Sequence, residues 1–287
     1  MKFSVSSYSF SQYIKDGRLT TLSCIEKAHE LGFDAIEFID SAVLDIDAAK
    51  ELADQAAYVG IEISNYAVGA DFINGSGGDI EKEIERLCAQ ADIAAALGCP
   101  TMRHDVTGGR TAHAFEGYDS VLERLAYGCR KVTEYAASVG VRTMTENHGY
   151  FSQDSLRVEK LINTVAHDNF GWLVDIGNFL CADDDPAVAV GRAARYAFYV
   201  HAKDFIVKSG QSHNPGRGFF LSRGGNFLRG TIIGHGNVPV LQCMRALKRA
   251  GYDGYIAIEF EGMEDCVDGV SIGFENLKRC VQEAYGE

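Results

Sequence analysis

The chain has 287 residues, 46% of them hydrophobic and 23% charged, so it can bury a large core. Its formal net charge of -13 argues against nucleic acid or an anionic membrane as the main partner, because both repel a strongly acidic protein. No stretch is apolar enough for a membrane span, and the N-terminus lacks the apolar run of a signal peptide.

Short apolar runs alternate with amphipathic helical patterns along the whole chain. The pattern predicts strands at residues 2–10, 33–39, 61–68, 99–106, 141–149, 170–178, 197–205 and 255–262. Helices are expected at residues 19–32, 47–60, 77–98, 119–140, 154–165, 185–197, 238–251 and 267–286. Alternating strands and helices imply parallel pairing, and eight such units imply one closed (β/α)8 TIM barrel over residues 1–287.

Residues 204–236 interrupt this rhythm between the seventh and eighth strands. The segment is rich in Gly and aromatic residues and carries Arg217, Arg223 and Arg229. Loops of this length in compact domains are usually functional. We expect an insertion that acts as a lid or contacts substrate, with its arginines on a phosphate or its aromatic rings on a sugar.

The eight cysteines are scattered, without a Cys-x-x-Cys pair. In a long chain with no export signal, this pattern is typical of reduced thiols. We therefore expect neither a disulfide framework nor a cysteine zinc site, and we expect the protein to be cytoplasmic.

Polar residues close the last four expected strands. In a TIM barrel the C-terminal strand ends meet at one mouth, so these side chains should converge. They are Glu146 and His148, Asp175, His201 and Lys203, and Glu259 and Glu261. Each also has a plainer interpretation: Asp175 as a helix cap, Glu261 as a loop residue, and Glu37, at an earlier strand end, as a structural ion-pair partner.

Three carboxylates and one imidazole at a single point would be strongly destabilising unless a positive charge lay between them. An oxygen-rich set with a single His favours Mn²⁺, with Mg²⁺ or Co²⁺ as alternatives. Zinc more often recruits further His or Cys ligands. The sequence therefore predicts one divalent cation at the barrel mouth.

Four motifs carry a family resemblance. "TENHG", "LVDIGN", "YVHAKD" and "GYDGYIAIEFEG", in this order, resemble the xylose isomerase-like TIM-barrel superfamily of sugar isomerases and epimerases. The resemblance spans nearly the whole chain and implies that Glu146, Asp175, His201 and Glu259 bind the metal. It further implies that Glu146 and Glu259 form the acid/base pair, and that the protein is a homo-oligomer.

The chain departs from the epimerase pattern at two positions. Asn178 stands where several epimerases have a His that holds substrate oxygens, and His148 stands where many have no titratable group. These departures are similar to a subgroup of lyases that act on 3-oxo-glycosides, including C-glycoside deglycosidases, in which a His near the metal serves as base. That resemblance implies a hetero-oligomer with a small subunit.

We expect a carbohydrate isomerase or epimerase that abstracts a proton next to a carbonyl and stabilises the resulting enediolate on its metal. The alternative is a lyase that eliminates across a carbon–carbon or carbon–oxygen bond with His148 as base, and a non-catalytic sugar-binding barrel comes third. A metal-dependent endonuclease on the same barrel is disfavoured, because such enzymes usually have a larger His-rich cluster and a basic face.

Further residues are expected to assist the reaction. Lys203 either offsets oxyanion charge or forms an ion pair with Asp204 or Glu146. His235, in "GHGNVP", either approaches the site or structures its loop. The expected substrate contacts are Asn178, Arg217, Arg229, His235 and His104.

Overall fold

The computed structural model describes residues 1–108 and 117–286. Eight parallel strands form a closed barrel in the order β1-β11-β7-β6-β5-β4-β3-β2, which confirms the predicted TIM barrel. The strands are β1 (Lys2–Ser6), β2 (Ala35–Ile39), β3 (Glu62–Val68), β4 (Thr101–His104), β5 (Arg142–Glu146), β6 (Phe170–Asp175), β7 (Ala197–Ala202) and β11 (Tyr255–Ile258).

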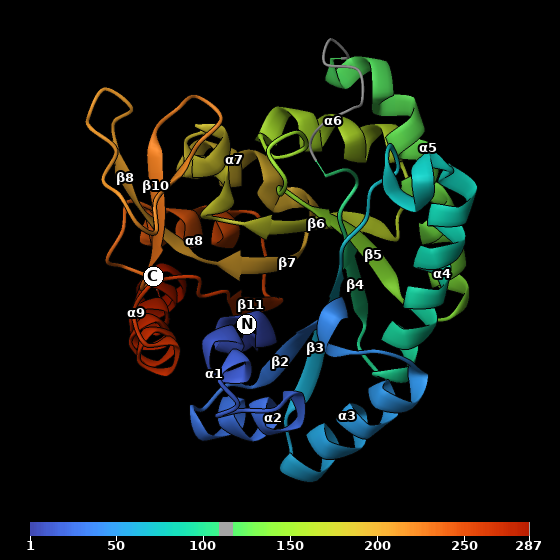
Figure 1. The fold of residues 1–287 in the computed structure, drawn as a ribbon, viewed down its shortest axis with the longest axis horizontal. Helices are drawn as coiled ribbons and strands as arrows, with labels where there is room; N and C mark the ends of the chain where they lie inside the picture. The colour runs from blue at the N-terminus through green and yellow to red at the C-terminus, as the bar shows by residue number, and fades with distance from the viewer. Residues whose placement is uncertain (109–116, 287) are drawn as a thin grey trace.

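Helices surround the strands, as Figure 1 shows. They are α1 (Ser11–Lys15), α2 (Thr21–Glu30), α3 (Ile46–Val59), α4 (Ile80–Ala96), α5 (Tyr118–Ser138), α6 (Ser155–Val165), α7 (Pro186–Ala193), α8 (Val240–Arg249) and α9 (Cys266–Gly286). Aspartates begin four of them, because each side chain accepts a hydrogen bond from a backbone N–H of the first turn. These caps are Asp45, Asp79, Asp154 and Asp185.

One apolar core joins the barrel to its helices. In α5, Leu125, Cys129, Val132 and Ala136 recur every three or four residues and are fully buried, which is the stripe a helix needs to pack on a sheet. All eight cysteines are free thiols, as the sequence predicts. Among the described residues, no helix is long and apolar enough to cross a membrane.

The first strand is shorter than expected. It ends at Ser6, and Ser7–Phe10 forms a turn of 3-10 helix where the sequence predicts continued strand. The Ser9 hydroxyl donates to the carbonyl of Ile258 at 3.1 Å and accepts from the N–H of Phe260 at 2.9 Å. These two hydrogen bonds fix the turn against the end of β11, at the barrel mouth.

The insertion after β7 is mostly ordered strand. It forms a three-stranded antiparallel sheet of β8 (Asp204–Lys208), β9 (Phe220–Leu221) and β10 (Phe227–Thr231), in the order β8-β10-β9. Figure 1 shows this small sheet projecting from the barrel beside α7 and α8. The sequence predicts a loop insertion at about residues 204–236 but not this sheet, and its role as a lid or in substrate contact stays a prediction.

A candidate metal centre at the barrel mouth

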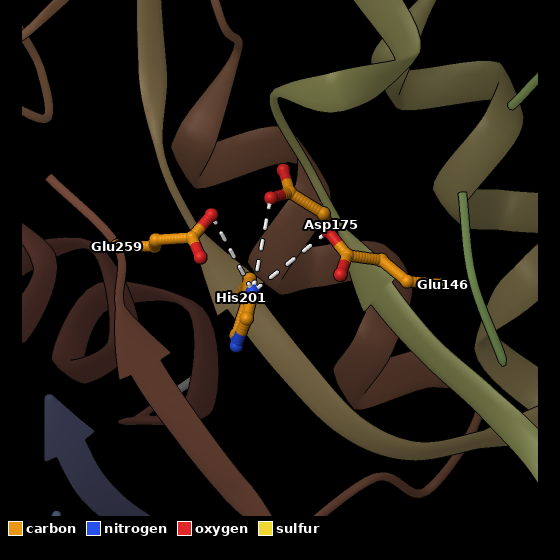
Figure 2. A group of neighbouring side chains, drawn as sticks. All are labelled: Glu146, Asp175, His201 and Glu259. Atoms are coloured by element: carbon orange, nitrogen blue, oxygen red, sulfur yellow. Dashed lines mark ion pairs between the residues drawn. The ribbon is translucent and has the colours of Figure 1, made fainter. Parts of the chain in front are cut away.

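Four side chains from adjacent strand ends meet in the barrel. Glu146 ends β5, Asp175 ends β6, His201 lies on β7, and Glu259 follows β11. The Nδ1 atom of His201 lies 3.9 Å from Glu146 Oε1, 3.9 Å from Asp175 Oδ2 and 3.8 Å from Glu259 Oε2. Figure 2 shows the three carboxylates arranged around this nitrogen. One donor atom from each residue lies within 4.8 Å of the other three.

Parallel pairing explains this convergence. Asp175 and His201 are direct partners in the β6–β7 register, and the N–H of Glu259 donates to Ala202 in β7 at 3.0 Å. The closed barrel then carries the end of β5 to the same level. The four residues predicted as ligands are therefore brought together by strand register.

Glu37 orients the imidazole of His201 through Nε2, the ring nitrogen that does not face the three carboxylates. Its two carboxylate oxygens each lie 3.0 Å from His201 Nε2, and both side chains are buried. Asn65 donates to Glu37 Oε2 at 2.8 Å, so the carboxylate is itself held in place. Because Nε2–H donates to Glu37, Nδ1 is the atom presented to the three carboxylates, an arrangement typical of metal-binding histidines.

A cation fits this donor set. His201 Nδ1 and Asp175 Oδ2 are buried and have no hydrogen-bond partner in the described part of the chain. Buried polar atoms are normally hydrogen-bonded. Lys203 Nζ lies 3.3 Å from Asp175 Oδ2, but His201 Nδ1 faces three carboxylates, so the space between these four groups suits a positive ion. Three carboxylates and one imidazole suit a divalent ion that prefers oxygen ligands.

Charge within the cluster shifts its protonation. Burial opposes the charged form of His201, but Glu37 and Glu259 outweigh it and raise the pKa of the imidazole to about 10. Burial also works to raise the pKa of Glu259, yet Lys203 and His201 lower it to about 2. In the metal-free chain a proton on His201 thus offsets part of the negative charge.

Lys203 forms ion pairs with carboxylates of the candidate metal centre. Its Nζ contacts Glu259 Oε2 and lies 3.3 Å from Asp175 Oδ2 and 3.9 Å from Glu261 Oε1. The ion pairs expected with Asp204 or Glu146 are not formed. Asp204 instead accepts backbone N–H groups of the insertion, from Gly234, Gly236 and Val238 among others, and shapes that segment.

A second network flanks Glu146. Arg103 Nη2 lies 2.7 Å from Glu146 Oε2 and 2.9 Å from Asp105 Oδ1. Asp105 Oδ1 in turn lies 3.0 Å from His148 Nδ1. The His148 side chain is 48% exposed, and Asp105 is the main cause of a raised pKa of this imidazole. His148 is therefore an accessible imidazole, oriented by a carboxylate, beside the cluster of four candidate ligands.

The centre opens into a pocket of about 260 Å³. Its lining includes the expected residues His148, His201, Lys203 and Glu259. It also includes Tyr8, Asp40 and Arg103, which were not expected at the site, and Glu261, which has a plainer interpretation as a loop residue. Burial is the main cause of the raised pKa of Glu261, which makes this carboxyl a proton donor candidate.

Asn178 contacts the centre through Glu146, one of the four candidate metal ligands. Its Nδ2 donates to Glu146 Oε1 at 2.8 Å, and its Oδ1 lies 3.4 Å from Lys203 Nζ. It thus bridges two residues of the site, and its expected contact with substrate stays a prediction.

Four expected substrate contacts lie elsewhere. His104 is buried against the rings of Phe72 and Phe170, because neighbouring residues on a strand face opposite sides and Arg103 takes the inward position. Arg217 and His235 are exposed and do not line the pocket. Arg229 lies 3.3 Å from Glu264 and stacks over Phe219. None of these four residues lines the pocket, so their contacts with substrate stay predictions. Arg223 and Arg229 form ion pairs with Asp154 and Glu264.

The missed residues had weak sequence signals. Arg103 precedes the His that was assigned, and strand parity alone separates the two. Asp105 and Tyr8 fall inside the expected strands 99–106 and 2–10, but the strands end at His104 and Ser6, so only the assembled barrel shows that these two residues reach the mouth.

The fold and this centre define a class of protein. A model of the xylose isomerase-like TIM barrel family matches residues 25–280, and the chain belongs to this family.

Curated relatives carry more specific names. The chain is 26% identical over 146 residues to an inosose dehydratase of Lacticaseibacillus casei, which covers 50% of this chain and 48% of that protein. It is 26% identical over 224 residues to the rhizopine catabolism protein MocC of Rhizobium meliloti, which covers 72% and 66%. The match thus spans about half the length of the first relative.

Several solved structures share the fold. The IolI protein with a bound zinc atom superposes with a TM-score of 0.79 at 15% identity over 100% of both chains. The probable 3-DHS dehydratase AsbF of Bacillus anthracis gives 0.73 at 16% identity, covering 97% and 99%. D-psicose 3-epimerase of Clostridium cellulolyticum H10 gives 0.69 at 18% identity, covering 100% and 97%.

Proposed function

We propose that this chain is a divalent-cation-dependent carbon–oxygen lyase that acts on a keto-carbohydrate or keto-polyol. The observation that carries the proposal is the His148–Asp105 pair beside the cluster of Glu146, Asp175, His201 and Glu259. It provides a base that is not itself a metal ligand. The names of the inosose dehydratase and of the probable 3-DHS dehydratase support this reaction class.

The contact with Asp105 makes His148 the proposed base. His148 Nδ1 is engaged by Asp105, so Nε2 is left with a free lone pair. It can take a proton from the carbon next to the substrate carbonyl. Glu259 is a poorer base, because its pKa is lowered to about 2. Burial raises the pKa of Glu146, but Arg103 and Asn178 contact its two carboxylate oxygens and occupy the atoms that would take the proton.

The remaining residues complete the elimination. A cation held by Glu146, Asp175, His201 and Glu259 would supply Lewis acidity to the substrate oxygens. The Lys203 ammonium lies at the same point and favours negative charge on the carbonyl oxygen. The bond then breaks between the next carbon and its hydroxyl oxygen. Glu261, which lines the pocket, would give that oxygen a proton, so that it leaves as water.

A sugar epimerase or isomerase is the second candidate. Its first step is the same proton abstraction, and the Glu146–Glu259 arrangement with the likeness to D-psicose 3-epimerase supports it. It differs in returning the proton rather than expelling oxygen. A sugar-binding barrel comes third, because binding alone does not require a base beside a cation site.

Mn²⁺ remains the proposed cation, with Mg²⁺ or Co²⁺ as alternatives. Zinc is a direct competitor, because the structurally similar IolI protein holds a zinc atom. Metal analysis after loading with an equal mixture of these ions would rank them. A homo-oligomer, or a hetero-oligomer with a small subunit, also stays a prediction, and so does a cytoplasmic location.

The test is proton exchange from D₂O into a panel of ketoses, inososes and 3-oxo-glycosides with Mn²⁺ present, followed by detection of the unsaturated ketone. We expect both signals in the wild type. His148→Gln should keep its metal and lose about 10²- to 10⁴-fold in rate, the usual contribution of a general base. His213→Gln, in the exposed insertion, is the matched control.

Two results would change the assignment. Exchange and epimerised product without elimination, lost in Glu259→Gln but kept in His148→Gln, would establish the second candidate. No exchange with any substrate by a protein shown to be loaded with metal would leave the binding barrel.

A further inference from the structure

The turn between β9 and β10 lies against the loop that carries His148. Arg223 in this turn donates from Nη1 to Asp154 Oδ2 at 2.8 Å, and its Nη2 donates to the carbonyl oxygen of Tyr150. The Tyr150 hydroxyl donates in return to the carbonyl of Leu221 at 2.9 Å. Three contacts therefore join the insertion to the segment between β5 and α6, and they begin two residues after His148.

The backbone of this loop has a shape that depends on its surroundings. Tyr150 has a φ of 60°, in the left-handed region that disfavours any residue with a Cβ atom. A non-glycine residue persists there only when neighbouring contacts fix it. The N–H of Tyr150 donates to Gln153, and its carbonyl accepts from Arg223. Because His148 forms a β-bridge with Ser152 across this turn, the shape of the turn also sets the direction of the imidazole.

The β9–β10 turn, residues 222–226, is itself anchored to the barrel. Asp183 Oδ1 accepts from Ser222 Oγ at 2.7 Å and from Asn226 Nδ2 at 2.8 Å. Asp183 ends the short 3-10 helix that follows Asp175. The turn is therefore tied on one side to the segment of a candidate metal ligand, and on the other side to the loop of the proposed base.

Arg223 can influence the reaction only through this loop. It does not line the pocket of the metal centre. Its ion pair with Asp154 is partly exposed, at 32% and 18% for the two side chains, and exposed ion pairs alone stabilise little. The contact with the carbonyl of Tyr150 is different, because it holds the backbone at the residue whose conformation is least favourable.

We propose that Arg223 is a positioning residue for His148: anchored through Asp183, it holds the loop after β5 so that the imidazole faces the metal pocket. The inference rests on the proposed function, in which His148 takes the proton from substrate. The insertion then serves the reaction from outside the pocket, by fixing the base relative to the four candidate ligands. Catalysis is sensitive to such placement, because a base displaced by about 1 Å loses much of its effect.

The test combines two measurements on the full chain loaded with Mn²⁺. In Arg223→Ala, the backbone amides of residues 147–154 should exchange hydrogen about 2- to 10-fold faster, the factor that one lost hydrogen bond provides. Proton exchange from D₂O into the most reactive ketose, inosose or 3-oxo-glycoside should show a kcat about 10- to 100-fold lower. The KM and the bound manganese should stay at their wild-type values, which a general loss of structure would not allow.

Three further variants separate positioning from other effects. Arg223→Lys keeps the charge and one of the two contacts, so its kcat should fall between those of the wild type and Arg223→Ala. Tyr150→Phe removes the hydroxyl contact with Leu221 and should change the same two measurements to a smaller extent. Lys208→Ala, which removes an exposed positive charge elsewhere in the insertion, should behave as the wild type.

Three results would overturn the inference. Unchanged hydrogen exchange of residues 147–154 in Arg223→Ala would show that the turn does not hold the loop. Faster hydrogen exchange with an unchanged kcat would show that His148 does not depend on this contact. A lower kcat accompanied by loss of manganese would assign Arg223 to the metal centre instead. Failure of the proposed function would appear differently, as absent proton exchange in the metal-loaded wild type, and the inference would fall with it.

Discussion

At the scale of single residues, Asp175 has a geometry compatible with both interpretations that its sequence position allows, a helix cap and a metal ligand. Its Oδ1 accepts from the N–H groups of Gly177 and Asn178 at 2.8 and 2.9 Å, which holds the start of the following 3-10 helix much as a cap would. Its Oδ2 has no hydrogen-bond partner in the described residues and faces His201. A helix cap and a ligand are therefore not competing roles, because the two carboxylate oxygens divide them.

Glu37 has a partner that its sequence position could not identify. The strand end at Glu37 predicts an ion-pair partner, and the structure places this carboxylate on His201 Nε2 at 3.0 Å. Sequence alone could not identify His201 as that partner, because the two residues are 164 positions apart and meet only when the barrel closes.

Glu37→Gln should weaken metal binding although the side chain is not in the ligand set. The amide keeps one acceptor for Nε2–H but loses the negative charge that orients the ring and raises its basicity. Changes of this kind typically cost about 10- to 100-fold in metal affinity. Competition with a chelator, monitored by the bound metal, would measure it.

Glu51→Gln, on the exposed face of α3, is the matched control and should bind metal like the wild type. If a folded Glu37→Gln protein bound Mn²⁺ as tightly as the control, Glu37 would have no role in positioning His201.

Strand parity explains why Arg103, and not His104, lines the pocket. The sequence places Arg103 and His104 at the end of one strand, and a shift of one residue decides which side chain faces the barrel interior. The register pairs Arg103 with Ala67, which lines the pocket, and this puts His104 on the helix side. Such a shift lies within the error of any boundary drawn from periodicity.

At the scale of elements, the insertion is the part that hydrophobic periodicity described least well. Its strands are short, and glycines and turns separate them, so the alternation that indicates a strand is weak. Long-range pairing supplies what local pattern does not: Phe227–Thr231 pairs with β8 on one side and β9 on the other. The length and place of the insertion were predictable, but its sheet was not.

Gly210 is a point of close approach in this sheet. A Cβ atom there would lie 2.3 Å from the carbonyl oxygen of Gly225, which is backbone and cannot rotate away. We expect Gly210→Ala to destabilise the insertion by about 1–3 kcal/mol, as overpacking does. Hydrogen exchange of residues 204–231 should become faster while the barrel strands keep their protection.

Gly191→Ala is the matched control. A Cβ atom at Gly191 has nothing within 4 Å, and the residue lies in α7, where Ala is the better helix former. It should leave stability unchanged or raise it. Unchanged exchange in Gly210→Ala would show that the β8–β10 pairing tolerates the added methyl group.

At the scale of the whole molecule, closure of the barrel accounts for what the sequence could predict of the site. Parallel strands linked by helices place every strand C-terminus at one mouth, so residues 146, 175, 201 and 259 had to lie on the same rim. The distances between these side chains, their hydrogen-bond partners and the positions of the loop residues beyond the strands depend on strand register and turn geometry. For this reason the proposed ligands were predictable, whereas the contacts of Asp105 and Arg103 were not.

The metal centre also affects the stability of the entire fold. Burial opposes a charged imidazole, but Glu37 and Glu259 outweigh it and raise the folded-state pKa of His201 from its ordinary 6.5 to about 10. In the metal-free protein, this proton therefore stabilises the fold fully below about pH 6.5, and the stabilisation is lost as pH rises through about 10. A cation needs the neutral imidazole, so it must displace the proton within this window.

Mn²⁺ should therefore raise the midpoint of thermal unfolding, and more so at about pH 8 than at about pH 6.5, because the competing proton binds less at the higher pH. With free metal at 100 times the dissociation constant, the stabilisation amounts to about 2.7 kcal/mol. Thermal unfolding with Mn²⁺ and with EDTA at both pH values would measure the effect. Asp175→Asn removes the charge of one of the four candidate ligands and should show a smaller shift. An equal shift at both pH values would show that no proton leaves His201 when metal binds, and no shift at either would show that the four residues hold no cation.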